Sequence, residues 1–336
     1  MKQLILNTFF PTIYQMIFLF AFIALGYILA KTKFLPASAA SILSKLENMI
    51  FIPALVLGTF IKNFTVASFS SAWKILLFSL ILELALIPIV ILICKLCAKD
   101  AYTRKIYTYG LAFSNFGFMG NAIVAALFPD FFADYILFTL PLWSLIYVWG
   151  VPSLLMGSDK EGEKPTLKSR LRSFVNPMLI CMVIGMILGI CGVGTVAIDP
   201  AAHPYLNGFR DSVLSIIDVA GSCMSPIAML LTGITLGSIH LSGTLKRGSI
   251  YVVSALRLLV FPLVAIGVLW FFPSCPRVLV ICTVCSLAMP LGLNTIVIPS
   301  AYGKDTSTAA GMALVSHLLS VLTIPVIFVL LAFLLG

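Results

Sequence analysis

Charged residues are scarce in this sequence. Only 10% of its 336 residues are Asp, Glu, Lys or Arg, with 12 acidic against 21 basic side chains, and histidine occurs three times. Soluble globular domains carry about 25% charged residues, so this scarcity excludes an ordinary water-soluble domain. Apolar residues make up 61% of the chain, and its mean hydropathy is +1.12. The composition therefore predicts an integral membrane protein.

Sequence motifs of enzymes are missing as well. The chain contains no Gly-x-Ser-x-Gly, no His-Glu-x-x-His and no Gly-rich Walker loop, so the nucleophile, metal and nucleotide sites that those motifs build are not indicated. Two cysteine pairs, Cys94 with Cys97 and Cys282 with Cys285, have metal-binding separation, but no second cluster with histidine completes a four-ligand site. We expect no catalytic residue, no metal and no cofactor.

Alternating strand patterns are also absent, which favours helices over a barrel as the spanning structure. A spanning helix needs about 20 largely apolar residues. Ten segments are candidates: 9–30, 46–61, 71–94, 106–128, 132–156, 174–196, 212–239, 249–272, 278–300 and 308–335. The sequence thus predicts an all-α integral membrane protein with ten transmembrane helices. No small-residue cleavage site follows the first span, so we expect this span to be retained.

The basic residues are sorted by membrane side. Fifteen of the 21 lie in loops after the odd-numbered spans, five lie on the opposite side, and Arg257 lies inside a span. Cytoplasmic loops carry the excess of Lys and Arg. We therefore expect the loop at 157–172 to be cytoplasmic and both termini to lie outside the plasma (inner) membrane. This sorting accounts for the net charge of +9 without a nucleic-acid partner.

The loop at 157–172 divides the chain into a first repeat, 1–156, and a second repeat, 173–336. Each contains five predicted spans, and an odd number makes the two repeats inverted relative to each other. An ionisable residue, Glu83 or Arg257, precedes a proline by five positions in the third span of each repeat. The second span of each repeat also contains a proline, and the fourth contains Leu-Ala before a break. Such recurrence is expected of an inverted-repeat transporter.

The fourth and ninth spans are both interrupted at mid-length. The interruptions contain Asn115, Gly117, Gly120 and Asn121 in the first case, and Pro290, Asn294 and Thr295 in the second. A helix that restarts beyond a break presents unpaired N–H groups and the positive end of its dipole, which attract carboxylates. These seven residues are our candidates for substrate binding. The alternative is that the glycines and the proline serve only close packing or a kink.

The segment 115–120, Asn-Phe-Gly-Phe-Met-Gly, resembles the Asn-x-Gly-Phe-x-Gly signature of the auxin efflux carrier family, a relative of the bile acid carriers. The segments 289–295 and 320–325 are similar to that family's last two spans. The resemblance implies a scaffold of spans 1, 2, 6 and 7, and a moving unit of spans 3–5 and 8–10. It also implies elevator-like movement, with the fourth and ninth spans crossing at the substrate site.

Carried over by position, the resemblance implies substrate contacts at Asn115, the backbone near Gly120, Pro290 and Asn294. The chain departs from the family at Ala122, where a proline is usual.

Several ionisable residues lie within the spans. Glu83 and Arg257 either form a structural ion pair, or Arg257 holds a substrate carboxylate while Glu83 carries a coupling proton. His317 either titrates near neutral pH or is a neutral hydrogen-bonding member of the helix bundle. Glu47 and Asp218 lie nearer the ends of their spans, where a wet or scaffold role is expected.

The leading hypothesis is secondary transport of a small organic anion, such as a mono- or dicarboxylate, without ATP, and a proton or sodium ion is a candidate coupling partner. A sodium-coupled symporter of the bile acid carrier type is the first alternative. A membrane channel or sensor is an alternative of a different class. The expected partners are the substrate, the lipid bilayer and a second copy of the chain in a homodimer.

Overall fold

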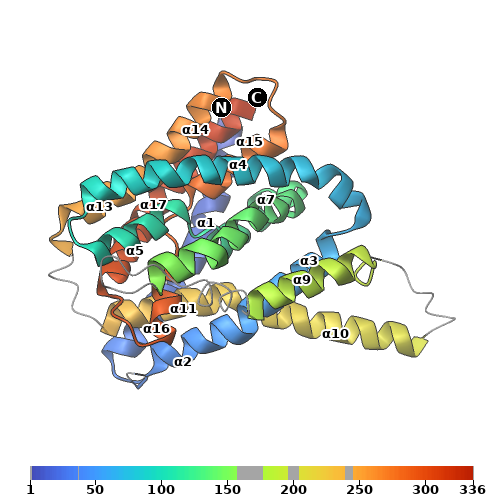
Figure 1. The fold of residues 1–336 in the computed structure, drawn as a ribbon, viewed down its shortest axis with the longest axis horizontal. Helices are drawn as coiled ribbons and strands as arrows, with labels where there is room; N and C mark the ends of the chain where they lie inside the picture. Colours follow the sequence, from blue (N-terminus) through green and yellow to red (C-terminus); the bar gives the residue numbers. More distant parts are fainter. Residues whose placement is uncertain (1, 37, 157–176, 196–203, 239–244, 336) are drawn as a thin grey trace.

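The computed structural model describes residues 2–36, 38–156, 177–195, 204–238 and 245–335. The regular elements of these residues are helices (Figure 1). Seven helical stretches in the described part are long and apolar enough to cross a membrane: Phe9–Lys31, Ala39–Asn63, Ala72–Cys97, Pro129–Leu155, Tyr205–Ser238, Gly248–Trp270 and Ser307–Leu335. The predicted all-helical membrane protein is confirmed. The arrangement of ten helices in two inverted repeats stays a prediction, and the loop at 157–172 lies outside the described residues.

Three shorter apolar helices fall within the predicted fourth, sixth and ninth spans. In the fourth, α5 (Ala101–Ala112) is followed by η2 (Phe116–Gly120) and α6 (Asn121–Leu127). In the ninth, α15 (Arg277–Ala288) is followed by α16 (Asn294–Ala301). The second break has a local cause, because Met289 precedes Pro290 and takes the extended backbone (ψ 149°) that such a residue favours. Each half-helix is shorter than the bilayer core is thick.

Prolines also shape helices that are not broken. In the second predicted span, the turn η1 (Glu47–Phe51) joins α2 (Ala39–Leu46) to α3 (Ile52–Asn63), which carries Pro53. In the eighth, η5 (Leu256–Val260) joins α13 (Gly248–Ala255) to α14 (Phe261–Trp270) just before Pro262. Both joints are π-helical, and such widened turns accommodate the lost N–H donor and the bulk of a proline ring. The sequence analysis did not predict them.

The longer helices pack in three groups. The helix α1 (Lys2–Lys31) packs against α11 (Met224–Ser238) and α17 (Ser307–Leu335), while α3 packs against α9 (Pro177–Ile190) and α10 (Pro204–Ser222). The long helix α4 (Val66–Cys97) lies across α5 and α7 (Phe132–Leu145), which continues into η4 (Ile146–Leu155) (Figure 1). A short turn, η3 (Pro129–Phe131), precedes α7.

Glycine permits the closest of these approaches. A Cβ added at Gly233 of α11 would lie 2.0 Å from the carbonyl oxygen of Ile23, and one at Gly26 of α1 would lie 2.2 Å from that of Leu230. Small residues at membrane helix interfaces allow backbones to touch in this way. The α1–α11 contact therefore depends on both glycines.

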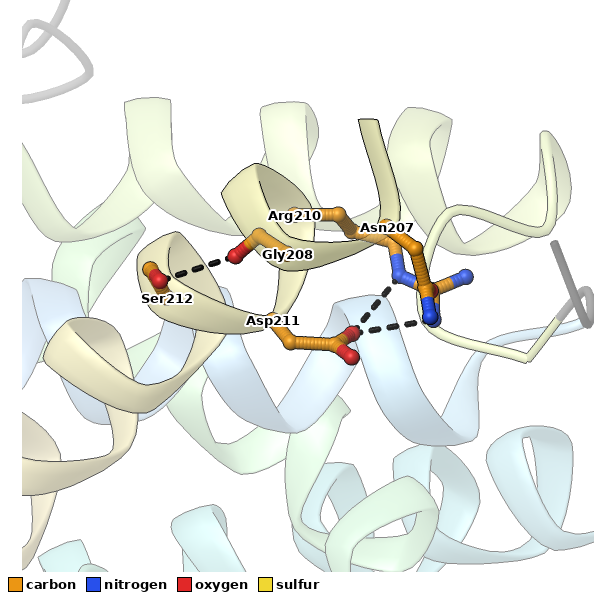
Figure 2. A network of polar contacts seen from close by, with 5 residues as sticks. All are labelled: Asn207, Gly208, Arg210, Asp211 and Ser212. Carbon is orange, nitrogen blue, oxygen red and sulfur yellow. Dashed lines mark hydrogen bonds and ion pairs between the residues drawn. The ribbon is translucent and has the colours of Figure 1, made fainter. Parts of the chain in front are cut away.

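The helix of the seventh span begins earlier than the sequence analysis predicted. Hydropathy placed its start at residue 212, but α10 begins at Pro204 and ends at Ser222, and α11 resumes at Met224. The early turns of α10 are helical but polar: Arg210 pairs with Asp211 and donates to Asn207, and Ser212 donates to the Gly208 carbonyl (Figure 2). A prediction from apolar stretches leaves out such polar turns, although their backbone is helical.

Candidate functional site

The two breaks meet. Ser114 and Leu291 form an isolated antiparallel bridge, and the Asn115 N–H donates to the Pro290 carbonyl at 2.8 Å. The Ser114 hydroxyl donates to the carbonyl of Ser286 at 2.8 Å. A Cβ at Gly292 would lie 2.4 Å from the Phe113 carbonyl oxygen, so only glycine fits there. The backbone groups freed by each break are thus partly satisfied by the other, as the lipid-surrounded interior demands.

Arg257 joins the two broken helices from a third. Its side chain is 1% exposed, and it donates from Nη1 to Leu111 O (2.9 Å), from Nη2 to Ser286 O (2.8 Å) and from Nε to Met289 O (3.2 Å). These carbonyls lie where α5 and α15 end, and helix C-termini carry unpaired carbonyls with partial negative charge. The guanidinium therefore offsets the negative ends of both half-helices.

The expectation of a direct ion pair between Glu83 and Arg257 is wrong for the described residues. No ion pair joins them, and Glu83 Oε1 is buried without a hydrogen-bond partner. The two side chains still interact electrostatically. Each of the three guanidinium nitrogens instead donates to a backbone carbonyl, an outcome that side-chain identities alone do not reveal.

His317 reaches the crossing through Asn115. The distance from Asn115 Nδ2 to His317 Nε2 is 2.9 Å, and His317 Nδ1 lies 2.8 Å from the Ala313 carbonyl oxygen. A carbonyl only accepts, so Nδ1 carries the proton, and Nε2 then accepts from the amide of Asn115. Both contacts fit a neutral ring, as expected if His317 is a hydrogen-bonding member of the helix bundle. The ring fixes the orientation of Asn115.

Several buried polar atoms at and beside the crossing have no partner. The Oδ1 atoms of Asn115, Asn121 and Asn294 are buried without a hydrogen bond, and so is the hydroxyl of Tyr109, which lies beside Asn294 without a well-aligned bond. Each unsatisfied buried group costs about 1–3 kcal/mol. The amides of Asn121 and Asn294 can turn end over end and present either the oxygen or the NH₂ group, whereas His317 holds that of Asn115. Tyr109 was not predicted, because nothing in its local sequence marks it.

The other predicted site residues have roles inside the protein. A Cβ at Gly117 would lie 2.4 Å from the Trp143 ring, and one at Gly120 would lie 2.4 Å from the Tyr135 hydroxyl, so both glycines serve close packing. The N–H of Gly120 donates to the Asn115 carbonyl at 3.0 Å, and the Thr295 hydroxyl donates to Gly292 O at 2.8 Å. These donors are already used in this structure.

The four other positions that the sequence analysis singled out differ in their surroundings. Pro290 contributes its carbonyl to Asn115. Ala122 lies inside the continuous helical stretch Phe116–Leu127 that η2 and α6 form together. Asp218 forms an ion pair with Lys62, and both side chains are exposed by more than 40%. Glu47 is 0% exposed, so the expectation of a wet position is wrong.

A cavity of about 400 Å³ adjoins the crossing. It lies between α1, α11 and α17, and its lining is apolar apart from groups such as Thr232 and His317. His317 therefore faces this cavity and also holds Asn115. The cavity is lined by two helices that the resemblance assigns to the scaffold, α1 and α11, and by one that it assigns to the moving unit, α17.

Comparison with known proteins identifies the family. A family model described as "Membrane transport protein" matches residues 11–328, a range that contains both breaks. The chain belongs to this membrane transport protein family. The match confirms the membership in the auxin efflux carrier family that the motifs predicted. No curated protein matches the chain. As a member of a transporter family, the chain is a multi-pass membrane transporter.

Proposed function

We propose that this transporter is a secondary carrier that moves a small organic anion, a mono- or dicarboxylate, across the plasma membrane by an elevator-like movement. The substrate would bind where the two broken helices cross. The observation that carries the proposal is the group of buried, unpartnered side-chain atoms there, on Asn115, Asn294 and Tyr109. Buried polar groups are normally satisfied, so a cluster of exceptions calls for a polar ligand.

The electrostatics of the crossing favour an anion. Arg257 offsets the negative C-terminal ends of α5 and α15. The helix α16 begins at Asn294, and its positive end remains on the side of the break. An amide NH₂ group and a phenol hydroxyl can donate to a carboxylate there. A carboxylate would therefore find donors and a favourable dipole at one place.

The packing supports the inverted-repeat architecture, which we include in the proposal. The helix of the first predicted span packs on the seventh, and that of the second packs on the sixth, as a scaffold of spans 1, 2, 6 and 7 requires. The antiparallel bridge at Ser114 and Leu291 fits two half-helices that run in opposite directions. The first repeat would comprise residues 1–156 and the second residues 173–336.

A sodium-coupled symporter of the bile acid carrier type is the second candidate. Unpartnered amide oxygens favour it, because hard cations prefer oxygen ligands. Acidic ligands are absent from the crossing in the described part of the chain, where no metal-binding cluster of His, Cys, Asp and Glu occurs. Coupling to sodium would then rest on amide and backbone oxygens alone.

Counterflow in liposomes tests the proposal. Purified protein is reconstituted, loaded with unlabelled succinate, and supplied with labelled succinate outside, with and without sodium. We expect saturable exchange that Asn115→Ala and Asn294→Ala weaken and that Asn207→Ala, on the distant α10, leaves unchanged. Exchange that requires sodium would favour the second candidate. Unsaturable flux would indicate a channel, and equal affinity in all variants would move the site elsewhere.

A further inference from the structure

Glu47 is a buried acid that the substrate site does not use. It begins the π-helical turn η1, two helical turns into the apolar stretch Ala39–Asn63, and its side chain is 0% exposed. Neither carboxyl oxygen, Oε1 nor Oε2, has a hydrogen-bond partner. An isolated carboxylate in such surroundings is strongly disfavoured, and the neutral acid is the form compatible with this packing.

The charges around Glu47 do not offset it. The elements packed on η1 are α2, α3, α9, α10, α11 and α16. Their ionisable residues in the described part are Lys45, Lys62, Cys181, Tyr205, Arg210, Asp211 and Asp218, of which Tyr205 is almost fully exposed. Lys62 is paired with Asp218 and Arg210 with Asp211, while Lys45 is exposed. None of these side chains forms an ion pair or a hydrogen bond with the Glu47 carboxyl in the described part of the chain.

Glu47 lies where η1 meets the helix that carries Asn294. Ser44 is one turn earlier on the same helical face, is also fully buried, and donates its hydroxyl to the Val297 carbonyl of α16. Val297 in turn lies one helical turn after Asn294, the first residue of α16. The face that contains Glu47 therefore packs on the half-helix that forms one side of the crossing.

This contact crosses the boundary between the two proposed units. The turn η1 belongs to the second predicted span, in the scaffold, and α16 belongs to the ninth, in the moving unit. An elevator-like movement would slide α16 along η1 and change the surroundings of Glu47. A carboxyl group whose burial depends on that contact would gain or lose its proton as the contact forms or opens.

We propose that Glu47 is a proton-binding site that holds one proton while α16 packs against η1 and releases it to water when the two separate. The O–H bond forms on a carboxylate oxygen with a proton from water on one side of the membrane, and it breaks to water on the other. Nothing is oxidised or reduced. The coupling of this proton to anion movement rests on the proposed function, whereas proton binding itself does not.

Infrared spectroscopy tests proton binding without any substrate. Difference spectra between acidic and alkaline pH are recorded on purified protein in liposomes, in the region of the protonated carboxyl C=O stretch. We expect a band that Glu47→Gln removes, because glutamine copies the size and shape of the protonated acid but does not titrate. Glu83→Gln is the matched control and should leave that band in place. An unchanged band in Glu47→Gln would overturn the proposal.

A second variant guards against misfolding. Ser44→Ala keeps the carboxyl group but removes the hydrogen bond to α16, so the Glu47 band should persist and titrate closer to the range of exposed acids. Thermal unfolding in detergent reports whether each variant is folded. A titration identical to that of the unmodified protein would show that the contact with α16 does not control the proton.

Transport tests the coupling. Succinate uptake into liposomes is measured with and without an inward proton gradient. We expect the gradient to stimulate uptake by the unmodified protein, and we expect Glu47→Gln to lose the stimulation while keeping succinate exchange. Equal stimulation in Glu47→Gln would overturn the coupling. If no variant moves succinate, the substrate assignment fails, and the infrared result still decides whether Glu47 binds a proton.

Discussion

The π-helical turns η1 and η5 resemble each other in backbone and differ in what they hold. Each contains five residues, precedes a helix with proline at its second position, and contains one buried ionisable residue. Arg257 in η5 donates to three carbonyls, whereas both oxygens of Glu47 in η1 lack a partner. A buried charge with every contact satisfied stabilises the structure around it. A buried acid with none lowers stability, and such exceptions call for a functional explanation.

The largest effect is expected at Arg257. Arg257→Leu removes hydrogen bonds to three buried carbonyls at the ends of α5 and α15, of which that of Ser286 keeps the Ser114 hydroxyl as a donor, and it should lower the free energy of unfolding by roughly 3–5 kcal/mol. Thermal or denaturant unfolding in detergent measures the change. Arg257→Lys should recover only part of the lost stability, because one ammonium group cannot reproduce the hydrogen bonds of the planar guanidinium. Arg210→Leu on α10 is the control, because its half-buried guanidinium donates to the side chains of Asp211 and Asn207 and not to the broken helices. Full stability with abolished succinate binding would instead make Arg257 a ligand of the anion.

The same contrast applies to asparagine. Asn207 has a partner in Arg210, whereas Asn115 and Asn294 have unpartnered amide oxygens at the crossing. Replacing Asn115 or Asn294 by Ala should weaken anion binding by roughly 1.5–3 kcal/mol, the scale of a hydrogen bond to a charged group. Titration of counterflow against succinate concentration measures the loss. Asn207→Ala should show none, and a loss of equal size there would remove the argument from the unpartnered atoms.

Replacing Glu47 should raise the free energy of unfolding, whereas replacing Arg257 should lower it. Glu47→Met removes an unsatisfied buried group and fills a similar volume, so the free energy of unfolding should rise by about 1–3 kcal/mol. Proton-stimulated succinate uptake should disappear in the same variant. Unfolding in detergent and uptake in liposomes measure the two effects. A destabilised Glu47→Met would mean that the carboxyl has a partner and that the contrast between the two π-helical turns is wrong.

The smallest effect is expected at Ser44. Ser44→Ala removes one neutral hydrogen bond to the Val297 carbonyl and should cost about 0.5–1.5 kcal/mol. Ser212→Ala on α10 removes a hydrogen bond to the Gly208 carbonyl within one exposed helix, and it should cost less. Comparison of the two unfolding free energies isolates the value of the contact between η1 and α16. Equal values would indicate that this contact adds nothing beyond an ordinary hydroxyl.

The breaks were predictable because their causes are local. Pro290 removes a donor and pushes Met289 out of helical geometry. The glycines of the Asn-x-Gly pattern weaken the first helix through their conformational freedom. The membrane environment followed from composition, since long apolar stretches cannot be hidden otherwise. These parts of the fold depend on neighbouring residues or on bulk properties.

The partners of the buried charges were not predictable, because they are distant in sequence or belong to the backbone. Every peptide has a carbonyl, so nothing in the sequence singles out Leu111, Ser286 and Met289 as acceptors for Arg257. Glu47 was placed near a span end because its apolar window began at residue 46, although the helix begins at Ala39. Tyr109 and the polar turns of α10 were missed for the same reason.

The bridge between Ser114 and Leu291 has a consequence for biosynthesis. Leu111 is translated long before Arg257, and Ser114 long before Ser286, yet the later residues satisfy the break in the earlier helix. The first five spans would enter the bilayer with exposed carbonyls at mid-depth, which lipid cannot hydrogen-bond. We expect the first repeat to stay incompletely folded, and open to degradation by membrane proteases, until the ninth span leaves the ribosome.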